Sequence, residues 1–232
     1  MITLRPSKER GYTRLNWLDS YHTFSFGDYY DPHYMGYRAL RVINEDRIKP
    51  GAGFPTHAHR EMEIVTYVLE GGVAHKDSTG TSSIIGAGEV QRMSAGTGIS
   101  HSEYNASKTE PAHFLQIWVV PDQPRLKPGY EQRSVELQKN AGRWVVMASG
   151  NNPDGAVKIH QDAELLLAQL AAGQRVTYRL REGRHAWLHV ARGTAVLDDT
   201  PLEAGDGAAI SGEQILEIAA PNSGEVLLFD LS

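Results

Sequence analysis

The feature of this sequence that most constrains its fold is a series of short apolar runs separated by turn residues. The runs are rich in Val, Ile, Tyr and Trp, and Gly, Pro and Asp interrupt them; examples are ALRVI, EIVTYVLEGG, HFLQIWVVP, AWLHVARG and EVLLFDL. Runs of about four to eight such residues, spaced by turn signals, are typical of strands in β-sandwiches and β-barrels. We therefore predict an all-β chain.

The two halves of the sequence resemble each other. A shift of 122 positions superimposes two glycines of the first half on two of the second, and a shift of 117 aligns the later Ala-Gly-Glu at 87–89 with Ala-Gly-Asp at 204–206. The matched glycines are Gly51 with Gly173, Gly71 with Gly193, and Gly88 with Gly205. Landmarks in the same order, with similar apolar runs between them, indicate an internal duplication.

The duplication predicts two domains. The polar segment 122–142 contains Pro and Gly and has no apolar run of the strand type. We place a linker at 126–142, an N-terminal domain at 1–125 and a C-terminal domain at 143–232. The segment DAELLLAQLAAG (162–173) has a high helix propensity by itself. Its counterpart ALRVINEDRIKPG forms helices poorly, so we predict a strand in both copies.

Composition and charge exclude several functions. The net charge is −5 and no run is rich in Lys or Arg, which argues against a nucleic-acid-binding protein. No apolar stretch approaches about 18 residues, and the charged start has no apolar signal-peptide core after it, so we expect a cytosolic protein without a membrane partner. Zero cysteines exclude disulfides, thiolate catalysis and Cys-ligated zinc. Any metal must be bound through nitrogen and oxygen.

Four candidate metal ligands occur as two pairs with the same spacing, His57-Ala-His59 and His101-Ser-Glu103. Residues i and i+2 of a strand point to the same face, about 6–7 Å apart. Two such pairs on facing or adjacent strands of a barrel converge on one point. Three imidazoles and one carboxylate suit Fe, Ni, Cu, Co, Mn or Zn. Such a set leaves room for exogenous ligands, which is typical of a catalytic site more than of a closed structural site.

These residues lie within longer motifs. GAGFPTHAHREME is close to the first cupin motif, and AGEVQRMSAGTGISHSE resembles the second. Together with LDSYHTFSFGDYYDP, MSAGTGISHSEYN and LQIWVVP, they make the chain resemble a bacterial pirin of the short type. The resemblance is strong over 1–121 and looser towards the C-terminus. It implies a double cupin fold, with one divalent transition metal ion per chain in the N-terminal cupin, held by His57, His59, His101 and Glu103.

A further carboxylate, Glu63, departs from the wider cupin pattern. In many cupins the Glu four residues after His-X-His is a ligand, whereas in pirins the Glu of the second motif, here Glu103, has this role. Glu63 has the same parity as His57 and His59. Two interpretations stay open for it, an inward-pointing partner of the metal ligands and a charge at the mouth of the barrel.

The second copy lacks the ligands of the first. In its sequence Arg179 aligns with His57, Arg181 with His59, Ile218 with His101 and Ala220 with Glu103. Guanidinium and alkyl groups do not bind cations. We therefore predict a metal-free C-terminal cupin with a structural role, while an anion at the two arginines stays open.

Several other residues have ordinary explanations. We expect His22, His33 and His75 to be surface or satisfied interior histidines, and Trp118 and Phe114 to be core residues.

The resemblance to bacterial pirins implies quercetin 2,3-dioxygenase activity, with a flavonol and O2 as substrates. The bound metal would lower the pKa of the flavonol 3-hydroxyl, and Glu103 would be the base that accepts its proton. The alternative is a redox or ligand sensor that acts through protein partners, and a third option is a bicupin with another small substrate. A deep pocket with aromatic walls at the metal would favour the enzyme, and an exposed apolar or basic face would favour the sensor.

Overall fold

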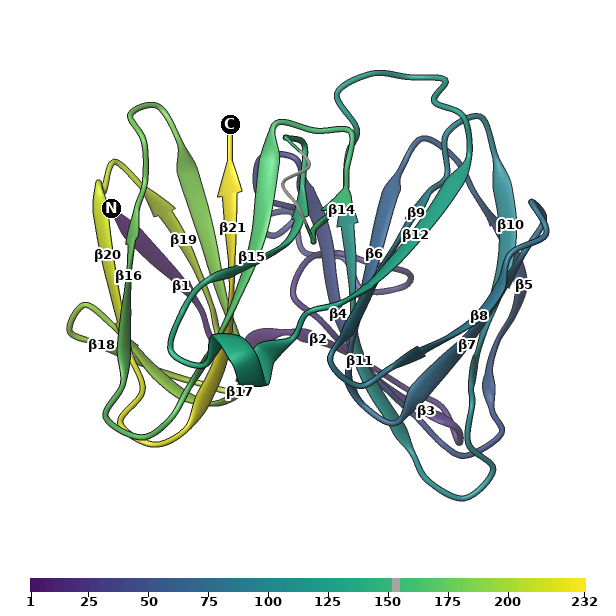
Figure 1. Cartoon of the computed structure of the whole chain (residues 1–232), viewed down its shortest axis with the longest axis horizontal. Helices are drawn as coiled ribbons and strands as arrows, with labels where there is room; N and C mark the ends of the chain where they lie inside the picture. Colours follow the sequence, from purple (N-terminus) through teal and green to yellow (C-terminus); the bar gives the residue numbers. More distant parts are fainter. Residues whose placement is uncertain (152–154) are drawn as a thin grey trace. The chain divides into compact units, whose positions relative to one another are not determined.

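The computed structural model describes residues 1–151 and 155–232, and its regular structure is almost entirely β-strand (Figure 1). Within these residues the helical elements are two short 3-10 helices, η1 (Ser7–Glu9) and η2 (Leu137–Asn140). The prediction of an all-β fold is therefore confirmed. None of the described helices is long and apolar enough to cross a membrane. Residues 152–154, which fall in the predicted C-terminal domain, lie outside the described residues.

The chain divides into two compact units. The N-terminal unit comprises 11–135 and 157–161, and the C-terminal unit comprises 1–10, 136–156 and 162–232. Each unit thus contains a short segment from the other half of the chain. In the C-terminal unit this segment is β1 (Ile2–Arg5), which pairs with β19 (Gly207–Ser211).

Two sheets build the N-terminal unit. The larger sheet has seven strands in the order β12-β9-β6-β11-β4-β3-β2, and the smaller sheet has four in the order β5-β10-β7-β8. The bounds of the larger sheet are β2 (Gly11–Arg14), β3 (Leu18–His22), β4 (Leu40–Ile48), β6 (Glu63–Glu70), β9 (Glu89–Ser94), β11 (Ala112–Val119) and β12 (Gly129–Ser134). Those of the smaller sheet are β5 (Gly53–His59), β7 (Gly72–Asp77), β8 (Ser82–Gly86) and β10 (Ile99–Asn105). The short strand β14 (Val157–Lys158) also belongs to this unit.

The interior of the N-terminal unit is only partly apolar. One apolar cluster contains Leu18, Ile48, Val68, Val73, Ile85 and Phe114, and another contains Ile64, Met93, Ala95 and Ile99. Buried polar side chains also point inward, among them Glu103, Gln116 and Thr66. Burying polar groups is unfavourable unless they have partners, so such an interior indicates a functional site more than a stabilising core.

The C-terminal unit has a continuous apolar core. Its main sheet follows the order β1-β19-β17-β21-β15-β13, and β16 pairs with β20. The strands are β13 (Val145–Ser149), β15 (Ala163–Leu170), β16 (Arg175–Arg179), β17 (His185–Leu197), β18 (Thr200–Glu203), β20 (Ile215–Ala219) and β21 (Gly224–Leu231). Its core is built almost wholly from Leu, Ile, Val and Ala side chains of these strands.

The structure confirms the internal duplication. The pair β5–β10 of the N-terminal unit corresponds in sequence to the pair β16–β20 of the C-terminal unit. All six matched glycines have a positive φ, at 68° and 77° for the first pair, 72° and 68° for the second, and 77° and 86° for the third. Residues other than glycine rarely adopt this backbone, so glycine is required at the same turns of both copies.

The strand predicted from the repeat at 162–173 is confirmed as β15, which pairs with β13 and β21. Pairing on both sides buries nearly all of this strand, so tertiary context overrides its helix propensity. The segment 126–142, predicted as a linker, contains β12 and η2.

Candidate metal centre

The two sequence pairs lie on adjacent strands of the smaller sheet. In the antiparallel pairing of β5 with β10, His57 is opposite His101 and His59 is opposite Ile99. Phe54 is opposite Glu103, so β5 advances three residues while β10 advances two. This β-bulge includes Pro55, whose missing N–H suits a position outside the ladder. The bulge sets where His57 lies relative to Glu103.

The structure brings three predicted ligands together. One nitrogen each of His57, His59 and His101 lies within 4.8 Å of the others. The ring centroids are 4.7 Å apart for His57 and His59, 4.5 Å for His57 and His101, and 4.9 Å for His59 and His101. Three imidazoles from two strands therefore converge on one point.

The hydrogen bonds of these rings leave nitrogen lone pairs available. Nδ1 of His57 lies 2.8 Å from the carbonyl oxygen of Pro55, and a carbonyl only accepts, so Nδ1–H donates and the lone pair of the neutral ring is on Nε2. Nε2 of His101 is buried and has no hydrogen-bond partner. A buried polar atom without a partner is unfavourable and calls for an explanation, and a bound cation provides one here. The residues therefore fit a metal ion.

The fourth predicted ligand, Glu103, is buried and held from the facing sheet. Nε2 of Gln116 donates to both carboxylate oxygens, at 3.1 and 2.9 Å. The hydroxyl of Thr66 lies 3.1 Å from Oε1 of Gln116 and 3.4 Å from Oε1 of Glu103. Its carboxylate forms a second potential metal-binding group with His75 and His101, again within 4.8 Å. The two groups overlap at His101.

The electrostatics of the site favour a cation. Burial and the neighbouring His57 lower the pKa of His59 to about 4. Burial and the neighbouring histidines lower the pKa of His101 to about 3. Both rings are therefore neutral at pH 7 and able to donate lone pairs. Burial raises the pKa of Glu103, so a positive ion beside it would stabilise the ionised carboxylate.

A cavity of about 440 Å³ opens beside the cluster. His57, His59 and Glu103 line it, and Phe26, Phe54 and Trp118 supply aromatic walls. The indole of Trp118 meets the His59 ring edge to face, with centroids 5.0 Å apart. The lining also includes the polar residues Ser20, His22, Asn44 and Asp46. The cavity therefore combines flat apolar surfaces with hydrogen-bonding groups, as small-molecule sites do.

Glu63 lies apart from this cavity. It is fully buried, accepts a hydrogen bond from Ser94 at 3.0 Å, and lies 3.3 Å from Nδ1 of His160. Glu63 thus bonds to β9 and to the segment 157–161 of the same unit. Neither interpretation left open by the sequence describes this position.

The structure agrees with the expectations for two other histidines and one aromatic residue and disagrees with the expectation for Trp118. His33 is exposed, and His22 is a satisfied interior histidine bonded to Asn44 and Thr13, as expected. Phe114 is fully buried in the core. Trp118 was wrongly predicted as a core residue, because it is only partly buried and lines the cavity.

The four positions of the C-terminal unit that align with the proposed ligands have different surroundings. Ile218 and Ala220 are fully buried in the apolar core, and Arg179 and Arg181 are exposed.

Two residues near the site were not among those that the sequence analysis assigned to it. His75 is buried and packs against His101, with ring centroids 5.3 Å apart. Asp46 lines the cavity and accepts a hydrogen bond from Ser20, and burial raises its pKa to about 7. His75 and Asp77 form an i, i+2 pair like the two ligand pairs, and this spacing is the sequence signal that could have indicated His75.

Comparisons with known proteins give a consistent result. The family model described as Pirin matches residues 3–119, and that described as Quercetinase C-terminal cupin domain matches 146–231. A protein of Escherichia coli K12 named quercetin 2,3-dioxygenase is 48% identical over 100% of this chain and 99% of its own length. A pirin-like protein of Caulobacter vibrioides is 40% identical over 99% of each chain. The crystal structure of the bacterial pirin YhhW from Escherichia coli in complex with nickel(II) matches with a TM-score of 0.94 and 46% identity, covering 100% of this chain and 99% of that one.

Proposed function

The chain belongs to the pirin family and has its double cupin fold, and from this premise we propose that it is a metal-dependent dioxygenase of the quercetin 2,3-dioxygenase type. In this reaction both atoms of O2 enter the flavonol, the C2–C3 and C3–C4 bonds break, and C3 leaves as carbon monoxide. The names of the relatives support this activity, and the nickel complex of the E. coli pirin supports a divalent metal.

The observation that carries the proposal is the cavity at the histidine cluster. Its volume of about 440 Å³ falls in the range of small-molecule sites. Phe54 and Trp118 offer flat faces to an aromatic substrate, while Asn44 and Asp46 offer hydrogen bonds to its hydroxyl groups. A planar molecule with several hydroxyl groups, such as a flavonol, matches both kinds of lining residue.

We propose His57, His59, His101 and Glu103 as the ligands of one metal ion per chain. Three neutral nitrogens and one oxygen suit the divalent ions of the first transition series. When bound, such an ion supplies a Lewis-acid position that lowers the pKa of the flavonol 3-hydroxyl and favours its reaction with O2. The three imidazoles set the geometry of the site.

We propose Glu103 as the base that accepts the proton of the 3-hydroxyl. It lines the cavity, and burial raises the pKa of its carboxyl, so the carboxyl is able to hold a proton. Gln116 holds both oxygens within 3.1 Å from the facing sheet, which fixes the carboxylate in place whether or not it carries a proton.

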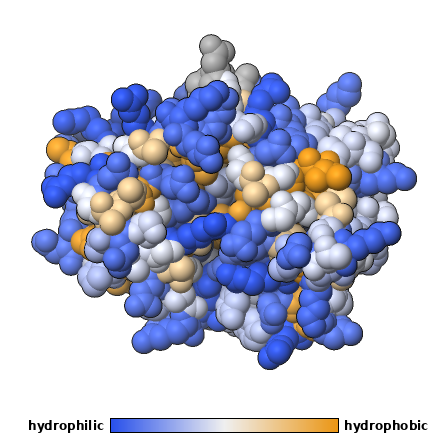
Figure 2. Space-filling model, turned by 60° about the horizontal axis from the view of Figure 1, so that its bottom comes forward, coloured by the Kyte–Doolittle hydropathy of each residue, from blue (hydrophilic) through white to orange (hydrophobic). Residues whose placement is uncertain are grey.

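A regulatory function through protein partners is the second candidate. The described surface includes exposed large apolar side chains on the smaller sheet, with Ile84 61% and Tyr104 39% exposed. These two line a shallow groove with Ala74, Lys76 and Ser102. The face in Figure 2 is mainly hydrophilic with small hydrophobic areas, which gives the regulatory candidate less support than the cavity gives the enzyme.

Incubation of the purified chain with quercetin under air tests the proposal. We expect the flavonol absorption band to disappear and carbon monoxide to be released, and we expect neither with Glu103→Gln. Binding of quercetin without carbon monoxide release would contradict the dioxygenase and favour a ligand sensor.

A further inference from the structure

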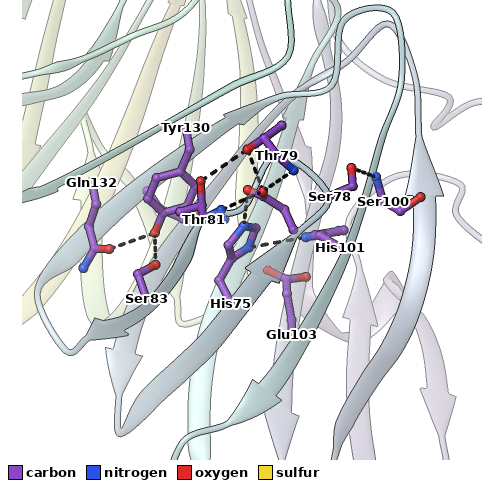
Figure 3. A network of polar contacts seen from close by, with 12 residues as sticks. His75, Ser78, Thr79, Thr81, Ser83, Ser100, His101, Glu103, Tyr130 and Gln132 are labelled. Atoms are coloured by element: carbon purple, nitrogen blue, oxygen red, sulfur yellow. Dashed lines mark hydrogen bonds and ion pairs between the residues drawn. The ribbon is translucent and has the colours of Figure 1, made fainter.

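A chain of three polar residues, Asp77, His75 and His101, runs from a surface turn to the candidate metal centre. Figure 3 labels its two histidines. Oδ2 of Asp77 lies 2.9 Å from Nε2 of His75, and Nδ1 of His75 lies 3.5 Å from Nδ1 of His101. All three side chains are buried. On its other side His75 packs against Tyr130, with ring centroids 4.9 Å apart. The His75 ring is thus held between two other rings.

The hydrogen bonds at Asp77 set the direction of the chain. Its Oδ1 accepts from the backbone N–H of Thr79 at 2.8 Å, from the Thr79 hydroxyl at 2.6 Å and from the backbone N–H of Thr81 at 3.2 Å. Burial raises the pKa of Asp77, but the bonds from His75 and Thr79 outweigh it and bring the pKa to about 2. Asp77 is therefore a carboxylate that only accepts, and Nε2–H of His75 donates to it.

The direction of that bond fixes the next one. A neutral His75 with its proton on Nε2 has a lone pair on Nδ1. The Nδ1 of His101 faces this lone pair, so His101 carries its proton on Nδ1 and donates it across a long contact of 3.5 Å. The lone pair of His101 is then on Nε2, which is the buried atom without a partner.

We propose that Asp77 and His75 are positioning residues that hold His101 in the tautomer whose Nε2 binds the metal. This inference rests on the proposed ligand set. Outer partners of metal-binding histidines commonly fix tautomer and ring orientation, and here the carboxylate acts through a second histidine.

The same residues allow a competing arrangement, in which a metal binds to His75, His101 and Glu103. Two observations argue against it. His57, His59 and Glu103 line the cavity whereas His75 and His101 do not, so a metal between the latter two would lie away from the substrate. Binding through Nδ1 of His101 would also leave its Nε2 buried without a partner.

The first test is the tautomer of each ring, read from two-bond ¹H–¹⁵N spectra of the full chain before and after Zn²⁺ is added. Asp77→Asn is the informative variant. Three donors keep the amide oxygen at the Oδ1 position, so the NH2 group faces His75 and donates to its Nε2. His75 then carries its proton on Nδ1, and His101 must move its proton to Nε2.

We expect the wild-type chain to show His75 protonated on Nε2 and His101 on Nδ1, and Asp77→Asn to reverse both. Glu45→Gln is the matched control, because Glu45 accepts from His113 at 3.0 Å in another buried pair of the same unit. Glu45→Gln should leave the tautomer of His101 unchanged. His75 protonated on Nδ1 in the wild-type chain would overturn the proposal, whether or not the metal binds.

The second test is zinc affinity, measured by competition with a chelator. We expect Asp77→Asn and His75→Leu to weaken binding by about 10–100-fold while one equivalent still binds at saturation. His75→Gln should recover part of the affinity, because an amide is able to donate to Asp77 and accept from His101.

His57→Ala distinguishes an error in the proposed ligand set from an error in the positioning role. If it binds zinc as tightly as the wild-type chain does, the proposed ligand set is wrong. If instead His75→Leu loses zinc as completely as His57→Ala does, His75 is a ligand and the positioning role is wrong. Unchanged affinity in both Asp77→Asn and His75→Leu would also overturn it.

Discussion

At the residue scale, the four proposed ligands make different predictions. His57→Ala and His101→Ala should lose the metal to a chelator that leaves it in the wild-type chain, because each variant removes one of the three nitrogen ligands. Glu103→Gln should retain part of the metal through its amide oxygen and lose turnover, because an amide does not accept the proton. Elemental analysis of the purified variants measures the metal. A full equivalent in either histidine variant would contradict the ligand assignment.

Asp46 gives a prediction about pH and stability. Its pKa is about 7 in the folded chain against an ordinary 3.8, mainly because it is buried. From pH 4 to 7 the unfolded chain releases a proton that the folded chain keeps, so the free energy of unfolding falls as pH rises. Asp46→Asn removes this decrease in the free energy of unfolding. The rise in pKa limits the decrease to about 4 kcal/mol. Urea unfolding in the presence of a chelator should show the variant gaining relative stability up to pH 7. If the free energies of unfolding of the variant and the wild-type chain differ by the same amount at every pH, Asp46 does not have the raised pKa.

How far the sequence predicts the site is also visible among single residues. His57, His59 and His101 could be predicted as a cluster because alternation along a strand fixes which side chains share a face. His75 could not be chosen in the same way, because its role depends on β7 lying beside β10 with Glu103 opposite it. The cavity position of Trp118 also depends on the facing sheet, which brings it to His59.

At the element scale, the contact between β5 and β10 carries the site, and Gly53 tests it. A Cβ at Gly53 would lie 2.3 Å from the carbonyl oxygen of Glu103 and 2.4 Å from Cα of Tyr104. Gly53→Ala should therefore push the two strands apart, lower stability by roughly 1–3 kcal/mol and weaken zinc binding. Gly129→Ala is the control, because its Cβ would meet only Arg92, at an ordinary 3.5 Å. Equal zinc affinity in both variants would mean that the contact between β5 and β10 does not set the geometry of the metal site.

Strands could be predicted from the sequence where the internal duplication supplied a second copy for comparison. The strand at 163–170 followed from its counterpart in the first copy, although its own residues favour a helix. The bulge at Pro55 was not predictable, because it depends on the register that β10 imposes on β5. That register decides where Glu103 lies relative to the histidines.

At the scale of the whole molecule, the two copies differ in what fills their interiors. The N-terminal unit buries polar groups beside a cavity, whereas Ile218 and Ala220 are buried in the apolar core of the C-terminal unit. We therefore expect one metal ion per chain. Zinc titration of the full chain should saturate at one equivalent, and anomalous density inside the C-terminal barrel would contradict the prediction.

The most direct test of the proposed function is the dependence of flavonol cleavage on the metal at constant fold. The chain is stripped of metal, its β-sheet circular dichroism spectrum is checked, and it is reconstituted in turn with Fe, Ni, Cu, Co, Mn and Zn. Ions with different redox and polarising properties in the same ligand set should differ widely in quercetin consumption and carbon monoxide release, and the metal-free chain should give neither. Identical slow consumption with every ion and with none would show autoxidation and contradict the dioxygenase.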